Sequence, residues 1–190
     1  MVRYSRYIRL SPALIAVATI FQLVISFIMD HPYASKPMTS GGGLYFRWHE
    51  WVDVVALAIL ACGWIYRVIN WKQAFHGRFF PWVTAPGRLS LVRETGQFLR
   101  FRWTEIPQDG ALVGTIHGLG LSIIAALVLT GGALYVALGA QNTVTPQARS
   151  LVTLHLSLAT FMWIYLCGHT LMAVWHQYIG QGDFARTVKL

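Results

Sequence analysis

Charged residues are scarce in this chain of 190 residues. Only 12% of the positions are Asp, Glu, Lys or Arg, which is about half the share found in soluble globular domains. No charged residue occurs from Ser150 to Gly182, and the mean hydropathy is +0.50. This composition excludes a soluble domain with a large core. We therefore expect an integral membrane protein whose immediate surroundings are lipid.

Several cofactor and ligand motifs are also missing. The chain has no C-x-x-C-H for covalent haem attachment, no cysteine cluster, no glycine-rich dinucleotide turn and no Walker sequence. Its two cysteines, Cys62 and Cys167, lie inside apolar stretches, where we interpret them as small core residues. The net charge of +8 does not indicate nucleic acid, because the cations flank apolar stretches instead of alternating with aromatic residues on a polar segment.

Four apolar stretches are long enough to cross about 30 Å of hydrocarbon. Helices are the expected structure, since no stretch has the alternating pattern of a membrane barrel strand. The first stretch lacks a small-residue cleavage site near its end, so we interpret it as a retained span. The sequence predicts an all-α four-transmembrane-helix bundle that forms one membrane domain over residues 1–190, with spans at about 11–29, 48–70, 111–139 and 150–179.

The distribution of basic residues predicts the orientation of these spans. Twelve of the 15 lysines and arginines lie on one side, at the N-terminus, in the segment 71–110 that follows the second span, at the end of that span, or in the tail. Only Lys36, Arg47 and Arg149 lie on the other side. The positive-inside rule therefore places both termini and the 71–110 loop in the cytoplasm.

Two loop features accompany the spans. In the cytoplasmic loop, Phe79-Phe80-Pro81-Trp82 forms an interfacial aromatic cluster, and Leu89 to Trp103 is predicted as a short basic helix on the headgroups or against a partner. In the outer loop, Gly41-Gly42-Gly43 predicts a flexible turn.

Two histidines lie inside the charge-free fourth stretch. His155 and His169 are fourteen residues apart, which returns a helix to within about 40° of its starting direction and advances it about 21 Å. One helix face therefore presents two imidazoles at different depths. Such groups are costly in a membrane unless they pair, bind a metal or line a pathway. The spacing favours two stacked haem positions.

Other histidines supply candidate partners at matching depths. His49 opens the second span on the same side as His155, so the pair has the depth needed for the two axial ligands of one haem. His117 opens the third span near the depth of His169, and the nearby Gly114, Gly118 and Gly120 allow a flat ring or another helix to approach. Iron ligation, quinone hydrogen bonding and helix contact all remain open for His117.

His176 lies two helix turns beyond His169 at the cytoplasmic boundary. A haem propionate, a quinone or water is its expected partner. His31 and His76 are interpreted as ordinary interfacial residues.

The fourth stretch, with the histidine spacing His155-x13-His169-x6-His176, resembles the last helix of bacterial cytochrome b561. It is equally similar to the cytochrome b (gamma) subunits of respiratory formate dehydrogenase and nickel–iron hydrogenase. His49 and the third-span run from His117 to Thr130-Gly131 fit the same pattern, so the resemblance covers nearly the whole chain.

The resemblance implies a multi-pass b-type cytochrome of the bacterial inner membrane. Such a protein relays electrons between redox partner subunits and quinone, and is an electron-transfer subunit more than an independent catalyst. It also implies that His49 and His155 ligate an outer haem b, and that His169 ligates an inner haem b with a histidine near the start of the first span. This chain departs there, since no histidine precedes His31. Either the inner haem is absent, or another ligand such as His117 replaces the missing histidine.

Two other functions compete with this one. A haem-poor or haem-free structural subunit that anchors a larger complex would explain the missing histidine. A proton-coupled carrier using His155 and His169 is a weaker alternative, because we find no acidic residue in the middle of a span.

Overall fold

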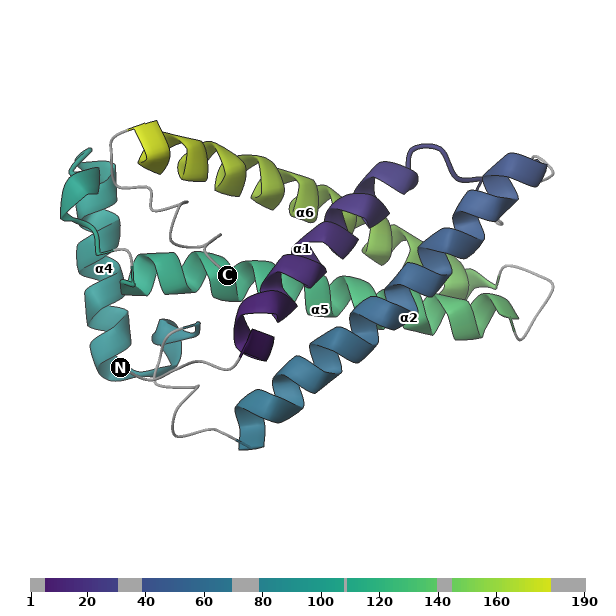
Figure 1. Ribbon diagram of the computed structural model, residues 1–190, viewed down its shortest axis with the longest axis horizontal. Coiled ribbons are helices and arrows are strands. Elements are labelled where there is room, and N and C mark those ends of the chain that lie inside the picture. Colours follow the sequence, from purple (N-terminus) through teal and green to yellow (C-terminus); the bar gives the residue numbers. More distant parts are fainter. Residues whose placement is uncertain (1–5, 31–38, 70–78, 108, 140–144, 179–190) are drawn as a thin grey trace. The chain divides into compact units, whose positions relative to one another are not determined.

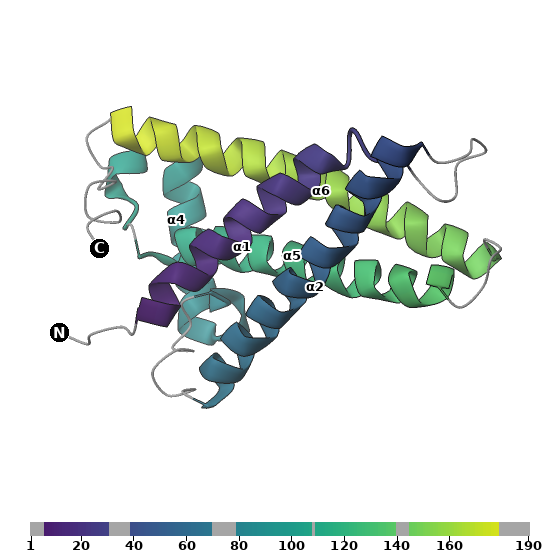
Figure 2. The same ribbon diagram turned by 45° about the vertical axis from the view of Figure 1, so that its right-hand side comes forward.

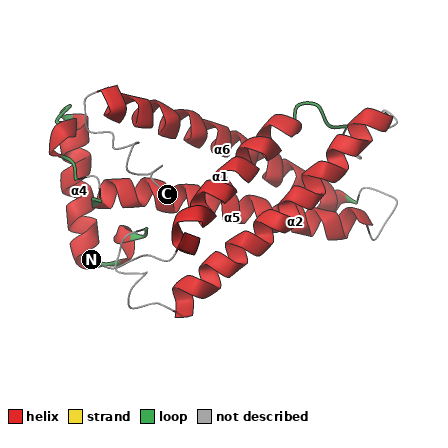
Figure 3. Cartoon of the chain, in the orientation of Figure 1, coloured by secondary structure: helices red, strands yellow, loops and turns green. Residues whose placement is uncertain are grey.

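The computed structural model describes residues 6–30, 39–69, 79–107, 109–139 and 145–178, and these ranges are helical with no strand (Figures 1 and 3). The α-helices are α1 (Arg6–Ile25), α2 (Ser40–Ile69), α4 (Ala85–Leu99), α5 (Ala111–Gly139) and α6 (Pro146–Tyr178). Two short 3-10 helices, η1 (Pro81–Val83) and η2 (Trp103–Glu105), flank α4. The predicted all-α class is confirmed.

The chain divides into two compact units. The first comprises Met1–Ala74 with Ser122–Ala159, and the second comprises Phe75–Leu121 with Thr160–Leu190. Each of the long helices α5 and α6 therefore contributes one part to each unit. In the first unit, α1 and α2 lie side by side and run in opposite directions (Figures 1 and 2).

Two of the described helices are long and apolar enough to cross a membrane. They are Ala111–Leu138 of α5 and Pro146–Tyr178 of α6. The apolar part of α1, Leu14–Ile25, is shorter. The 30 residues of α2 are interrupted by charged side chains, namely Arg47, Glu50, Asp53 and Arg67.

Large apolar side chains on α5 and α6 are exposed more often than they are packed. Leu129, Phe161 and Ile164 are each at least 60% exposed, whereas Met162 is only 3% exposed. Such apolar exposure is unfavourable in water, and it is the normal condition of a helix that faces lipid.

The start of α2 differs from the prediction. Gly41-Gly42-Gly43 was expected to be a flexible turn before a span beginning at residue 48, but α2 begins at Ser40 and includes all three glycines. The side-chain oxygen of Thr39 accepts a hydrogen bond from the Gly42 N–H at 3.0 Å, which caps the helix. Asp30 accepts bonds from the Thr39 N–H and hydroxyl at 2.7 and 2.6 Å, and a β-carbon at position 42 would collide with its carboxylate.

The start of α6 also differs from the prediction, by four residues. The helix begins at Pro146 rather than Ser150. The side-chain oxygen of Thr145 accepts a hydrogen bond from the Ala148 N–H at 3.2 Å. Proline is favoured in a first turn because its missing N–H would have no intrahelical partner there.

The basic helix of the loop is likewise shifted, to 85–99 instead of 89–103. It starts early because Thr84 accepts a hydrogen bond from the Gly87 N–H at 3.2 Å. It ends at Leu99, beyond which Phe101 adopts a φ of 59°. This left-handed conformation is uncommon for a bulky residue and stops the helix.

A buried carboxylate attaches α4 to the beginning of α5 in the second unit, where α4 lies across the start of α5 (Figure 1). Glu94 is only 2% exposed, and its Oε2 accepts a hydrogen bond from the Leu112 N–H at 2.7 Å. The positive end of the helix dipole and an otherwise unpaired N–H stabilise this charge. Gly110 provides the necessary space, because a β-carbon there would lie 2.5 Å from Oε2.

We predict that Glu94→Ala lowers the free energy of unfolding by about 1–3 kcal/mol, since it removes a charge-assisted hydrogen bond and leaves a helix N–H unpaired. Denaturant titration in detergent micelles, followed by tryptophan fluorescence, measures the change. Glu105→Ala is the control, because Glu105 is exposed and lies 3.6 Å from Arg102, a surface pair expected to contribute less than about 1 kcal/mol. Equal losses from the two variants would contradict the role assigned to Glu94.

Candidate functional site

Two predicted site histidines meet in the first unit. His49 on α2 and His155 on α6 have ring centroids 6.4 Å apart, with ring planes at 81°. Neither ring is fully exposed, and Nδ1 of His49 is shielded from solvent. Residues more than a hundred positions apart thus present two imidazoles to each other.

A hydrogen bond orients the ring of His155. The Thr130 hydroxyl of α5 lies 2.9 Å from Nδ1 of His155. The same hydroxyl donates to the backbone carbonyls of Ala126 at 2.8 Å and Leu127 at 3.0 Å. A hydroxyl has one proton, and when that proton is donated to either carbonyl, Thr130 accepts from the Nδ1–H of His155. This tautomer leaves the lone pair on Nε2 available for a metal.

A carboxylate lies close to this histidine pair. Asp53 is one helix turn after His49 on α2, and its side chain lies against Gly131, the residue after Thr130. A β-carbon at position 131 would lie 2.5 Å from Oδ2 of Asp53. The sequence placed Asp53 at the start of the second span, and the structure adds that a glycine of α5 admits its carboxylate.

The second unit brings together the other histidine pair. The ring centroids of His117 on α5 and His169 on α6 are 5.2 Å apart, at 75°. Nδ1 of His117 lies 2.9 Å from the Val113 carbonyl oxygen. A carbonyl can only accept, so Nδ1 carries the proton and Nε2 again keeps its lone pair. Tyr165 stacks on His169 with a centroid distance of 5.4 Å and an interplanar angle of 14°.

The glycines beside His117 accommodate protein groups. A β-carbon at Gly118 would collide with the Phe79 backbone carbonyl, and one at Gly120 would collide with the Tyr165 ring. Of the two expected occupants, a flat ring or another helix, α6 fills the space at Gly120, and a loop carbonyl fills it at Gly118. Their small size lets the loop and the facing tyrosine reach the α5 backbone.

The remaining histidines are less informative. His176 lies in the last turn of α6, next to Trp175. The ring centroids of Trp175 and Trp103 are 5.0 Å apart. His31 and His76 lie outside the described residues.

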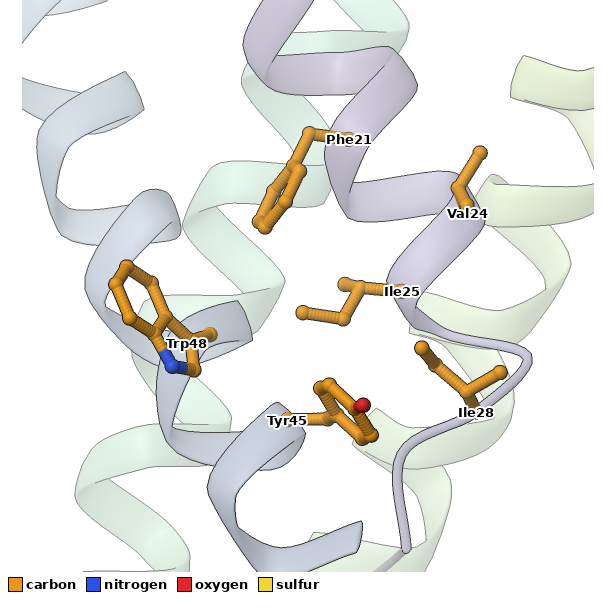
Figure 4. Close-up of a pocket in the computed structure, with 6 residues that line it drawn as sticks. All are labelled: Phe21, Val24, Ile25, Ile28, Tyr45 and Trp48. Atoms are coloured by element: carbon orange, nitrogen blue, oxygen red, sulfur yellow. The ribbon is translucent and has the colours of Figure 1, made fainter. Parts of the chain in front are cut away.

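An apolar pocket of about 330 Å³ lies between the end of α1 and the beginning of α2 (Figure 4). None of the predicted site histidines is among its lining residues, which are Phe21, Val24, Ile25, Ile28, Tyr45 and Trp48. This pocket is therefore separate from the histidine pairs.

The imidazole separations can be compared with the needs of haem iron. A metal–nitrogen bond of about 2 Å, with about 1.1 Å from nitrogen to ring centre, places two axial imidazole centroids about 6 Å apart. The His49–His155 separation of 6.4 Å fits this requirement. The His117–His169 separation of 5.2 Å is about 1 Å too short, so these rings would have to separate to admit an iron atom.

A metal ion held by protein side chains alone needs more ligands than either histidine pair supplies. In the ranges that the structure describes, no group of three or more His, Cys, Asp or Glu side chains is arranged to hold a metal ion. A flat macrocycle needs only two protein nitrogens, because its own nitrogens complete the coordination, and the His49–His155 pair has the separation for this.

Three residues near the histidines were given no role from the sequence. Asp53 and Tyr165 each lie four residues from a site histidine, His49 and His169 respectively. That spacing places each of them on the same helix face as its histidine. Their proximity to the site could therefore have been predicted from the sequence. Thr130 has no comparable signal, because it meets His155 only through the packing of two helices.

Comparison with known proteins identifies one family. A family model described as prokaryotic cytochrome b561 matches residues 3–188. Searches of curated proteins and of solved structures found no match. The resemblance inferred from the histidine spacing is confirmed.

Proposed function

The chain belongs to the prokaryotic cytochrome b561 family of membrane b-type cytochromes, and we propose that it holds haem b between His49 and His155 and relays electrons between a redox partner subunit and quinone. Membership of this family implies that the chain transfers electrons in a membrane. The haem ligands, the partner and the quinone are the proposed part.

The His49–His155 geometry is the observation that carries this proposal. Their centroid separation of 6.4 Å matches two axial imidazoles on one iron. The Thr130 hydroxyl lies 2.9 Å from Nδ1 of His155, and donation by the Nδ1–H leaves the Nε2 lone pair for iron. Haem b held by two histidines exchanges one electron and keeps no open position for oxygen.

The protein residues around this pair supply orientation and exclude water. Thr130 contacts the ring of His155, and two apolar residues of the same helices, Val128 of α5 and Val152 of α6, are buried at 4% and 8% exposure. An apolar, water-poor shell is one of the means by which a protein sets the potential of a bound redox group.

We propose that the second pair, His117 and His169, ligates an inner haem. The proximity of the two rings, the Nε2 lone pair of His117 and the absence of a histidine before His31 support His117 as the replacement ligand. The short separation favours a rival arrangement, in which the two rings, Tyr165 and His176 border a quinone site.

We further propose a multi-pass protein of the bacterial inner membrane, with four spans and both termini in the cytoplasm. The apolar lengths of α5 and α6 support two of the spans. The twelve-to-three distribution of basic residues supports the orientation. The missing substrate motifs support a relay whose specificity lies in partner subunits.

Replacing either His49 or His155 with Ala should abolish one low-spin b-haem signal, because each variant removes an axial nitrogen. Reduced-minus-oxidised visible spectra of the purified protein measure the effect. Cys167→Ala is the control, since Cys167 is exposed on α6 and belongs to neither pair. Survival of the full signal in both histidine variants would reject the assignment. No haem in the unmodified protein would favour a structural anchor.

The inner site is tested by stoichiometry. We expect two haems per chain in the unmodified protein, measured by pyridine haemochrome against protein concentration. His169→Ala and His117→Ala should each reduce the ratio to one, because a bis-histidine iron needs both ligands. A ratio of one that His169→Ala leaves unchanged would favour the quinone site.

Reporter fusions test the orientation. Fusions at Leu190 and within 71–78 should be active with a cytoplasmic reporter, and fusions within 31–38 and 140–144 with a periplasmic one, because the basic segments stay inside. Periplasmic activity at Leu190 would contradict both the orientation and the even number of spans.

A further inference from the structure

The hydroxyl of Thr130 occupies an unusual position among the helical hydroxyls of this chain. Thr153 and Ser157 of α6 each donate to a carbonyl four residues earlier, at 3.1 and 2.8 Å. Thr130 makes the same kind of bond to Ala126, and its oxygen also contacts Nδ1 of His155 at 2.9 Å. Bonding to the preceding helix turn is thus common here, and contact with a site histidine is an added feature.

The direction of this hydrogen bond follows from proton counting. The Thr130 hydroxyl has one proton and lies within hydrogen-bond distance of the carbonyls of Ala126 and Leu127. When that proton goes to either carbonyl, the oxygen presents a lone pair to Nδ1 of His155. In this arrangement Thr130 is the acceptor and the Nδ1–H of His155 is the donor.

An acceptor at the N–H of an axial imidazole changes the electronics of the opposite nitrogen. It pulls the proton outward and increases the electron density on Nε2, which makes the ligand more basic. A more basic ligand stabilises ferric iron more than ferrous iron, so the reduction potential falls. A substitution at position 130 can remove this acceptor and leave the histidine in place.

We propose that Thr130 is a positioning residue that fixes the Nδ1-protonated tautomer of His155 and lowers the reduction potential of the outer haem. This inference rests on the proposed ligation by His155. In this inference, a hydroxyl on α5 changes the basicity of a haem ligand on α6, and through it the reduction potential of the haem.

The test compares Thr130→Ser with Thr130→Ala. Both variants lose the γ-methyl group, and only serine keeps the hydroxyl, so the difference between them reports the hydrogen bond. We expect the outer haem of Thr130→Ala to have a higher midpoint potential than that of Thr130→Ser, and to bind haem about tenfold or more weakly. Spectroelectrochemical titration gives the potential, and haem titration of the apoprotein gives the affinity.

Thr153→Ala is the matched control. It removes a hydroxyl that bonds to the preceding turn of α6 in the same unit, so it should leave the potential unchanged. Equal potentials for Thr130→Ala and Thr130→Ser would overturn the inference. So would a shift of the same size in Thr153→Ala.

A parallel measurement on His155→Ala separates this inference from the proposed function. Loss of the outer haem in His155→Ala, with equal potentials for the two Thr130 variants, rejects the role of Thr130 alone. Retention of the outer haem in His155→Ala rejects the ligation itself. Should Thr130→Ala bind no haem, a normal potential in Thr130→Ser supports the inference, and loss of haem from both overturns it.

Discussion

The placement of imidazoles within apolar helices is the constraint on which this protein depends. A polar ring surrounded by hydrocarbon needs a partner, and water is not available to provide one. The chain meets this need by pairing histidines from different helices, His49 with His155 and His117 with His169. Helix packing in this protein is therefore linked to its candidate cofactor sites, since it places the histidines of different helices opposite each other.

The two pairs differ in how they are supported. His155 is held by a threonine hydroxyl at 2.9 Å and faces His49 at a separation suited to iron. His169 is stacked against Tyr165 and contacts His117 more closely. A ring held by a hydrogen bond keeps its tautomer and direction, whereas stacking restrains only its plane. The first pair is thus the better-organised candidate for a metal site, and the second is equally suited to bordering an organic ligand.

Glycines on α5 show how a membrane helix makes room for function. Gly118 admits a loop carbonyl, Gly120 admits the Tyr165 ring and Gly131 admits the Asp53 carboxylate. Each one removes a side chain where another polar or aromatic group must approach the backbone. Close approach of this kind replaces the hydrophobic driving force that is missing between helices in lipid.

The sequence by itself determined the class of protein, the positions of α5 and α6 to within a few residues, and the four histidines of the two pairs. These follow from hydropathy and from helical spacing, which are local properties. The family also follows from that spacing, and the match over residues 3–188 agrees. The start of α2 could not be predicted in this way, because a side chain from the preceding loop, Asp30, supports its cap.

The tertiary structure decided what lies beside each histidine. The contact of Thr130 with His155, the approach of Asp53 to Gly131 and the burial of Glu94 at the start of α5 all join different helices. A periodic pattern states which face of a helix a residue occupies, and it does not state which residue of another helix meets that face. The hydrogen-bond partner of His155 depends on such a meeting, so only the packed helices could identify it.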